Sequence, residues 1–282
     1  MSPPRRVNGV CLNVEVTREG PAVLLLHGFT GSAASWAPFM GAWHGFTLIA
    51  PDLLGHGASD HPADSGHYSM ERCVEDLLAL LDRLSVGRVA VVGYSMGGRV
   101  ALHLALAAPE RLWALVLESV SPGIDDPGER AARRESDEAL AGAIEREGVE
   151  AFVARWESQP LFASQARLPP AVRDELRRQR LRNSAQGLAN SLRGMGAAAQ
   201  EPLWDRLREV QAPALLIAGA LDAKYCALAR RMAQGLPRAR VEIVPDAGHA
   251  VHLEQPEAFA GAVRAFLVRC LGADKEEALK CR

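Results

Sequence analysis

The stretch VAVVGYSMGGRVALHLALAA, residues 89–108, places one serine between an apolar run and a helical pattern. The run 89–92 predicts a buried strand, and the residues from Gly97 onward predict a helix. Between them, residues 93–97 fit the G-x-S-x-G pattern of a nucleophilic serine at a sharp strand-to-helix turn. Glycine permits such a turn, and the positive end of the helix dipole favours negative charge there. This context predicts that Ser95 is a nucleophile and not an idle serine in a glycine-rich turn.

A serine hydroxyl is a weak nucleophile until a base accepts its proton. His249 is the predicted base and Asp222 its orienting carboxylate, because Ser, Asp, His is the chain order of partners for this motif. Both residues follow apolar runs, so they are expected at the carboxyl ends of strands, where sites of open α/β sheets assemble. Two other carboxylates compete for the orienting role: Glu118 ends an earlier strand, and Asp246 is expected to shape its own turn.

Two backbone N–H groups are expected to form an oxyanion hole beside the serine. One belongs to Met96, the residue after the nucleophile. The other belongs to Phe29 in HGFTG, residues 27–31, because Gly28 and Gly31 allow that loop to bend.

The other polar residues near these motifs are expected to be structural. His27 and His56 lie in glycine-containing turns, and His252 shares the loop of His249 without directly following a strand. Asp52 and Ser59 in PDLLGHGASD could touch the pocket, but an architectural loop held by its glycines is the favoured interpretation.

Short apolar runs alternate with helical windows along most of the chain. The runs are continuous, as in strands covered on both faces: AVLLLHG, TLIAPDLLG, VAVVGYS, ALVLESVS, PALLIAGALD and RVEIVPDAGH. In residues 69–84, apolar side chains recur at three- and four-residue steps, as in an amphipathic helix. The alternation predicts an α/β fold with a mostly parallel central sheet and flanking helices. Residues 9–17 are expected to add an antiparallel strand or two at one edge.

The segment 125–208 breaks this alternation because it contains no strand-like run. It is helical in character and rich in arginine, glutamate and alanine. Since it lies between two predicted strands, the simplest interpretation is a helical cap inserted over the carboxyl edge of the sheet. The predicted core is therefore residues 1–124 together with 209–282.

Composition narrows the class of protein. The 282 residues carry a formal net charge of −2, which indicates no surface for nucleic acid or other polyanions. The apolar runs are too short to span a membrane, and the N-terminus lacks the apolar region of a signal peptide. The five cysteines are scattered without a C-x-x-C pair, which favours free thiols in the cytoplasm over disulfides or a zinc site. An oligomeric state is not predicted.

Arg99 is a charge that ester hydrolysis does not obviously need. It lies four positions after Ser95, roughly 6 Å along the helix axis, so both residues start on about the same side of the helix. Its planar guanidinium suits a two-pronged contact with a carboxylate. The alternative is a salt bridge to an acidic residue of the cap or a nearby loop, and the residues alone leave both open.

Four motifs together resemble the α/β-hydrolase fold over nearly the whole chain: LLHGFTGSAASW, PDLLGHGASD, VVGYSMGGRVAL and PDAGHAVHLEQPEAF. Further segments are similar to the 2-succinyl-6-hydroxy-2,4-cyclohexadiene-1-carboxylate (SHCHC) synthase family of menaquinone (vitamin K2) biosynthesis: GYSMGGR, ERAARRESDEAL, ARWESQPLFAS and RQRLRNSAQGLANSLRGMG. The segments from the predicted cap are the more specific, because caps usually diverge most.

The resemblance implies a carbon–oxygen lyase that needs no cofactor and no metal. In this family the triad removes a proton, pyruvate leaves 2-succinyl-5-enolpyruvyl-6-hydroxy-3-cyclohexene-1-carboxylate, and SHCHC forms without addition of water. The implied partner is therefore a small polycarboxylate. Whether Ser95 or His249 takes the proton directly stays open at this point.

The resemblance also implies which residues bind the substrate. Matched motif by motif, they are Tyr94, Arg99, Arg133, Trp156 and Arg180. A shift of register would exchange Arg133 with Arg134, or Arg180 with Arg182. Because the cap has nearly as many acids as bases, a solvated helix surface is the alternative for its arginines.

Two other functions remain open. A serine hydrolase of esters or C–C bonds would share the triad and the oxyanion hole, so only the cap would distinguish it. A non-catalytic ligand-binding member of the fold is the second alternative, although the intact Ser95, Asp222 and His249 argue against it. Dehalogenases and epoxide hydrolases are disfavoured, because they carry an aspartate at the position of Ser95.

Overall fold

The central sheet contains seven strands in the order β3-β5-β4-β6-β7-β8-β9. The structure, a computed structural model, describes residues 4–280, with side chains as far as residue 272. β3 runs antiparallel to β5, and the other neighbouring pairs are parallel, which confirms the predicted α/β fold with a mostly parallel sheet. The strands are β3 Val14–Val16, β4 Ala22–Leu26, β5 Thr47–Pro51, β6 Val89–Tyr94, β7 Leu112–Glu118, β8 Ala214–Gly219 and β9 Ala239–Val244.

The N-terminal residues form two separate antiparallel pairs. β3 joins the edge of the main sheet, whereas β2, Val10–Leu12, pairs with β1, Arg5–Val7, in a two-stranded ribbon. Asn13 separates β2 from β3, and its Nδ2 donates a hydrogen bond of 2.9 Å to Asp52 Oδ2 in the loop after β5. Only one of the strands expected at the edge therefore belongs to the sheet.

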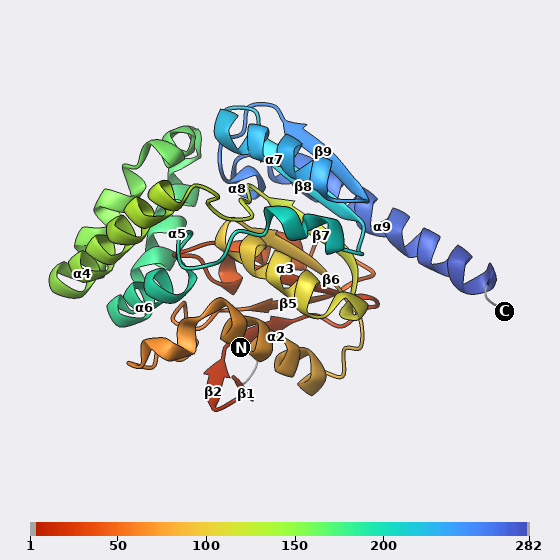
Figure 1. The fold of residues 1–282 in the computed structure, drawn as a ribbon, viewed down its shortest axis with the longest axis horizontal. Coiled ribbons are helices and arrows are strands. Elements are labelled where there is room, and N and C mark those ends of the chain that lie inside the picture. Colours follow the sequence, from red (N-terminus) through yellow and green to blue (C-terminus); the bar gives the residue numbers. More distant parts are fainter. Residues whose placement is uncertain (1–3, 281–282) are drawn as a thin grey trace.

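Helices cover both faces of the sheet (Figure 1). The helices of the core are α1 Ala37–Met40, α2 Met70–Arg83, α3 Met96–Ala107, α7 Ala223–Gly235, α8 Val251–Glu254 and α9 Pro256–Lys280. Short 3-10 helices connect the elements: η1 Ala33–Trp36, η2 Ser65–Tyr68, η3 Pro109–Arg111, η4 Pro160–Arg167 and η5 Trp204–Glu209. Cys281, one of the five cysteines interpreted above, lies outside the described residues.

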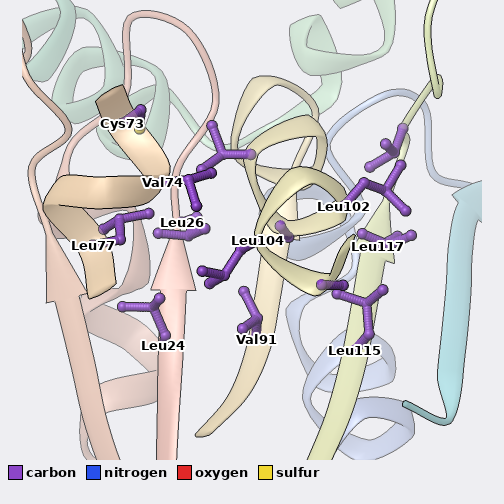
Figure 2. Close-up of a cluster of buried hydrophobic side chains, with 14 of the residues drawn as sticks. Leu24, Leu26, Cys73, Val74, Leu77, Val91, Leu102, Leu104, Leu115 and Leu117 are labelled. Atoms are coloured by element: carbon purple, nitrogen blue, oxygen red, sulfur yellow. The ribbon is translucent and has the colours of Figure 1, made fainter. Parts of the chain in front are cut away.

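Alternate residues of β4 face the two helical layers, as the strand period of two requires. Leu24 and Leu26 pack in a buried cluster with residues of α2, α3 and α7, and Figure 2 shows part of this cluster. Val23 and Leu25 point the other way, into a cluster that includes residues of α1 and α9. β9 is different, because its Arg240 and Glu242 are exposed at the sheet edge. The prediction that helices cover both faces of this strand, made from its apolar run, is therefore wrong for β9.

A group of helices lies between β7 and β8 along the chain and stands beyond one end of the sheet in Figure 1. Its α-helices are α4 Pro127–Glu157, α5 Pro170–Leu181 and α6 Ala185–Met195. α4 is kinked at Gly148, where φ is +84°. α4 and α6 share a buried cluster of their own, which includes Ile144, Phe152 and Leu188. The segment thus packs as a separate layer and contains no strand among its described residues.

Candidate active site

Ser95 sits on the turn between β6 and α3, with φ 50° and ψ −107°. Its backbone N–H donates to the carbonyl of Glu118 at 2.9 Å. The glycines after it are required by close approach: a Cβ on Gly97 would lie 2.2 Å from the carbonyl oxygen of Leu26, and one on Gly98 would lie 2.0 Å from Val120 Cγ2. The G-x-S-x-G-G pattern therefore lets the turn pack directly against neighbouring backbone, with the serine at its tip.

The structure brings together the three residues expected to form a triad. His249 Nε2 lies 3.2 Å from Ser95 Oγ, and His249 Nδ1 lies 3.0 Å from Asp222 Oδ2. The imidazole is buried, with its side chain 2% exposed, while that of Asp222 is 10% exposed. With Nδ1–H donated to the carboxylate, Nε2 is the ring nitrogen able to accept the serine proton. In space the three side chains therefore form one hydrogen-bonded series, from Ser95 through His249 to Asp222.

Asp222 has two partners because it also begins a helix. It is the N-cap of α7, and its Oδ1 accepts a hydrogen bond of 3.2 Å from the backbone N–H of Tyr225. The Tyr225 ring packs against His249, with ring centroids 4.5 Å apart. Burial raises the pKa of the Tyr225 hydroxyl, so this group stays protonated and can donate a hydrogen bond.

The two backbone N–H groups expected in the oxyanion hole lie on separate loops. Met96 is the first residue of α3, and Phe29 follows β4 in the loop closed by the hydrogen bond from Gly31 N to Gly28 O, 3.0 Å long. Neither the N–H of Phe29 nor that of Met96 is used in a hydrogen bond within residues 4–280. Both are therefore available to an oxygen atom of a ligand.

His27 holds the loop of Phe29 in place. Its Nε2 accepts a hydrogen bond of 2.9 Å from Leu53 N, and its Nδ1 lies 2.8 Å from Gly28 O, so the neutral ring carries its hydrogen on Nδ1. Burial lowers the pKa of His27. Burial, and second the repulsion that a protonated His27 would exert, lower the pKa of His56 to about 3. Both histidines are thus neutral parts of the fold.

Asp52 and Ser59 also serve the loops rather than the pocket. Asp52 accepts hydrogen bonds from the backbone N–H groups of Ala33 (2.6 Å) and Ala58 (2.8 Å). Ser59 Oγ donates to the carbonyl of Asp52 at 2.6 Å. These contacts account for both side chains without a ligand.

Arg99 has no acidic partner among the described residues. Its Nη1 donates a hydrogen bond of 3.0 Å to Oε1 of Gln200, which is neutral and only 4% exposed. Burial lowers the pKa of Arg99 to about 10, which still leaves the guanidinium charged at neutral pH. The salt bridge considered from the sequence is thus not made, and a partly buried positive charge lies one helical turn from Ser95.

Arg133 and Arg134 point to different partners. Arg133 Nε donates to Asp137 Oδ1 at 2.8 Å, and its charge contributes to the lowered pKa of Arg99. Arg134 instead donates to the carbonyl of Ala198 at 3.1 Å. Asp137 Oδ2 is buried and has no hydrogen-bond partner in the described part of the chain. Of the two arginines, Arg133 is therefore the one that lies electrostatically close to Arg99.

Arg180 lies near Tyr94, whereas Arg99 and Arg133 lie near Tyr225. Arg180 lines a small cavity of about 40 Å³ together with Phe29, Tyr94 and Trp156. Its Nη1 lies 3.1 Å from Glu157 Oε1 and its Nη2 lies 3.3 Å from Gln165 Oε1. Arg180 thus reaches the cavity already bound to a carboxylate of the protein.

Trp156 and Tyr94 contribute aromatic surface to the same cavity. The Trp156 ring packs on Phe29 with centroids 5.4 Å apart, and its buried Nε1 has no partner within the described residues. The Tyr94 ring lies 5.5 Å from that of His249, and burial raises the pKa of its hydroxyl. The cavity therefore offers two neutral hydrogen-bond donors, the Trp156 Nε1–H and the Tyr94 hydroxyl.

An open groove of about 480 Å³ adjoins this cavity. Four residues line both spaces and so form the wall between them: Phe162, Gln165, Leu176 and Arg180. Arg173, Arg177 and Glu157 line the groove but not the cavity. The groove is the larger of the two spaces.

Sequence reasoning did not identify Gln200, the partner of Arg99, or Glu157, the partner of Arg180. Gln200 lies outside every quoted motif, and Glu157 lies inside ARWESQPLFAS but was not singled out, because its contact with Arg180 follows from packing of the helical segment. Glu118 was considered only as a rival to Asp222; it is instead fully buried and bonded to His252. No group of three or more His, Cys, Asp or Glu side chains that could hold a metal ion occurs among those that the structure describes.

Comparisons with known proteins identify the same fold and a family. The family model of the alpha/beta hydrolase fold matches residues 21–256. A protein of Bacillus subtilis strain 168, provisionally named 2-succinyl-6-hydroxy-2,4-cyclohexadiene-1-carboxylate synthase, is 49% identical over 256 residues, which cover 89% of this chain and 93% of that protein. The 2-succinyl-6-hydroxy-2,4-cyclohexadiene-1-carboxylate synthase of Serratia proteamaculans strain 568 is 33% identical over 249 residues, covering 88% and 93% of the two chains. The solved structure of MenH from S. aureus has a TM-score of 0.85 at 31% identity and covers 92% of this chain and 98% of its own.

Proposed function

We propose that this chain, which belongs to the α/β-hydrolase fold family and within it to the SHCHC synthase family, eliminates pyruvate from 2-succinyl-5-enolpyruvyl-6-hydroxy-3-cyclohexene-1-carboxylate to give SHCHC. Relatives named for this product match it over most of its length, at 49% and 33% identity. Within the site, the observation that carries the choice of a carboxylate-rich substrate is Arg99, a partly buried charge whose hydrogen-bond partner is a neutral amide. A desolvated cation without a counter-ion is costly unless a ligand supplies the negative charge.

In this proposal the triad acts as a base toward carbon. A ring carbon of the substrate loses its proton to the Ser95–His249 pair, with Asp222 holding the imidazole in the tautomer that accepts it. The electron pair left on carbon forms the new double bond, and the C–O bond to the enolpyruvyl group breaks. Enolpyruvate leaves with the bonding pair, takes a proton on carbon and becomes pyruvate, so no water is consumed.

The N–H groups of Phe29 and Met96 would stabilise negative charge that develops on an oxygen of the substrate. Arg99 and Arg133 would bind a carboxylate on the Tyr225 side of the triad, and Arg180 another on the side of Tyr94 and Trp156. Neutralising these carboxylates lowers the repulsion that would otherwise oppose a growing negative charge. The same arginines make the site a poor fit for a neutral ester.

Residues 125–208 serve in this proposal as a cap on the core formed by residues 1–124 and 209–282. The cap contributes Arg133, Trp156 and Arg180, and the core contributes the triad and Arg99. The polycarboxylate substrate and the cytoplasmic location expected from the cysteines belong to the same proposal.

The test supplies the substrate in situ from the enzyme that precedes it and follows pyruvate release. We expect Ser95→Ala and His249→Ala each to lower turnover by about 10³-fold or more while the protein stays folded. A reaction without enzyme corrects for spontaneous elimination.

Pyruvate release by Ser95→Ala at the wild-type rate would contradict the proposed mechanism. Fast hydrolysis of short nitrophenyl esters with a burst of nitrophenol, together with no pyruvate release, would identify a serine hydrolase instead. Binding of the substrate without turnover by the wild type would identify a ligand-binding protein.

A further inference from the structure

A second buried acid–imidazole pair lies beside the triad. Glu118, at the end of β7, is 0% exposed, and His252, in α8, is 2% exposed. The Glu118 carboxylate accepts hydrogen bonds from the backbone N–H of His252 (3.0 Å) and from its Nδ1 (2.9 Å). Removing a carboxylate so completely from water is costly unless hydrogen bonds replace its hydration, and the His252 donors do so here.

Glu118 touches both sides of the contact between serine and histidine. Its main-chain carbonyl accepts the N–H of Ser95 at 2.9 Å, and its side chain holds His252, three residues after His249. One residue therefore connects the turn that carries the serine to the loop that carries the imidazole.

The loop of His249 is also held on its other flank. Glu254 Oε2 accepts the N–H of Gly248 at 2.8 Å, and its Oε1 accepts that of Ala250 at 3.3 Å. These bonds set the local shape of the loop, but both ends of each bond lie within the loop and the adjoining helix. The bond to Glu118 is different in kind, because it fixes the loop relative to β7 and thus relative to Ser95.

We propose that Glu118 is a positioning residue of the triad, which through His252 and through its own carbonyl keeps Ser95 and His249 within proton-transfer distance. The present distance of 3.2 Å between Ser95 Oγ and His249 Nε2 is at the long end of a hydrogen bond, so a small further shift of the loop interrupts proton transfer. A displacement of about 1 Å at a catalytic contact can lower a rate by about 100-fold. This role rests on the proposed function only for its effect on turnover, because activation of Ser95 by His249 does not depend on the substrate.

The test compares two variants. Glu118→Met keeps the side-chain volume and removes both carboxylate oxygens, whereas the side-chain amide oxygen of Glu118→Gln can still accept from both donors of His252. The first measurement is the labelling rate of Ser95 by a fluorophosphonate, in which Ser95 Oγ displaces fluoride from phosphorus and the serine proton passes to His249. The second is kcat and KM for pyruvate release. We expect Glu118→Met to lower the labelling rate and kcat by about 10- to 100-fold with KM within about twofold, and Glu118→Gln to recover most of the loss.

Asp76 supplies a matched control. It is a carboxyl group that is also buried (8% exposed), it accepts a hydrogen bond of 2.9 Å from Asn8, and it lies on α2 outside the site. Asp76→Leu should lower the melting temperature without changing the labelling rate. If folded Glu118→Met labels at the wild-type rate, if Glu118→Gln recovers nothing, or if Asp76→Leu slows labelling equally, Glu118 does not position the triad. If the wild type labels but releases no pyruvate, the proposed function fails, while the labelling series still decides the role of Glu118.

Discussion

Arg99 shows how one residue can report the chemistry of a ligand. Its position on α3 follows from the sequence, but its significance depends on its partner, Gln200, which is neutral. Gln200 Nε2 is itself buried and without a partner among residues 4–280. A carboxylate bound here could accept from both side chains, which would satisfy a charge and an amide that the protein leaves unmatched.

Arg99→Ala should therefore weaken the transition state for pyruvate release. Removing one partner of a buried charge pair costs about 2–5 kcal/mol, or roughly 30- to 5000-fold in kcat/KM. Arg99→Lys retains the charge without the planar fork and should recover part of the loss. Steady-state kinetics of the three proteins check this, and an unchanged kcat/KM for Arg99→Ala would show that Arg99 does not bind the substrate.

At the scale of elements, the end of α4 and the C-terminal half of α5 are joined through one carboxylate. Glu157 Oε1 contacts Arg180 at 3.1 Å and its Oε2 contacts Arg177 at 2.6 Å. Arg180 lines the cavity beside Tyr94 and the outer groove, whereas Arg177 lines the groove alone. A substrate carboxylate that binds Arg180 must therefore compete with Glu157.

Glu157→Gln should lower KM by about 2- to 5-fold, because a partly exposed ion pair contributes about 1 kcal/mol or less to holding Arg180 away from the substrate. Arg177→Gln is the matched control: it removes the other partner of Glu157 and leaves the Glu157–Arg180 pair intact. KM measured for pyruvate release distinguishes the outcomes. A KM that rises in Glu157→Gln would mean that Glu157 orients Arg180 for binding instead of competing for it.

At the scale of the whole molecule, the fold depends on histidines that are neutral when buried. His56 is 1% exposed, and its ring centroid lies 5.1 Å from that of His27. Its pKa is lowered to about 3, first by burial and second by the repulsion that His27 would exert once protonated. In the unfolded chain the same group titrates near 6.5, so the unfolded state binds protons more readily below that pH. The stability that neutral His56 contributes is present above pH 6.5 and is lost as the pH falls toward 3.

The free energy of unfolding should accordingly fall from about pH 6.5 to about pH 3, and His56→Gln should reduce this slope by up to one proton, about 1.4 kcal/mol per pH unit. Urea unfolding across this range measures the slope independently of any constant loss caused by the substitution. His44→Gln is the control, since the His44 side chain is 79% exposed. Equal slopes for the wild type and His56→Gln would exclude this histidine as a source of acid sensitivity.

The fold as a whole also accounts for the way in which distant residues meet. Ser95 and His249 are 154 residues apart, yet their proximity was predictable, because each follows a strand and the carboxyl ends of parallel strands share one edge. No helix in the described part of the chain is long and apolar enough to cross a membrane.

The sequence by itself determined the mostly parallel sheet and the strand-to-helix turn at Ser95. Continuous apolar runs are typical of strands in a parallel sheet, and a G-x-S-x-G motif between a strand and a helix is typical of the turn that carries a nucleophilic serine. Both patterns are local, so the sequence shows them directly. Tertiary structure alone decided that Arg99 meets neutral Gln200, that Glu118 binds His252 and that Glu157 occupies Arg180. The first two contacts join residues 101 and 134 positions apart, and side-chain packing of the helical segment and loops selects such partners without any periodic signal in the sequence. The proposed nucleophile can therefore be predicted from a motif, whereas the charge that we propose to meet the substrate is a property of the folded chain.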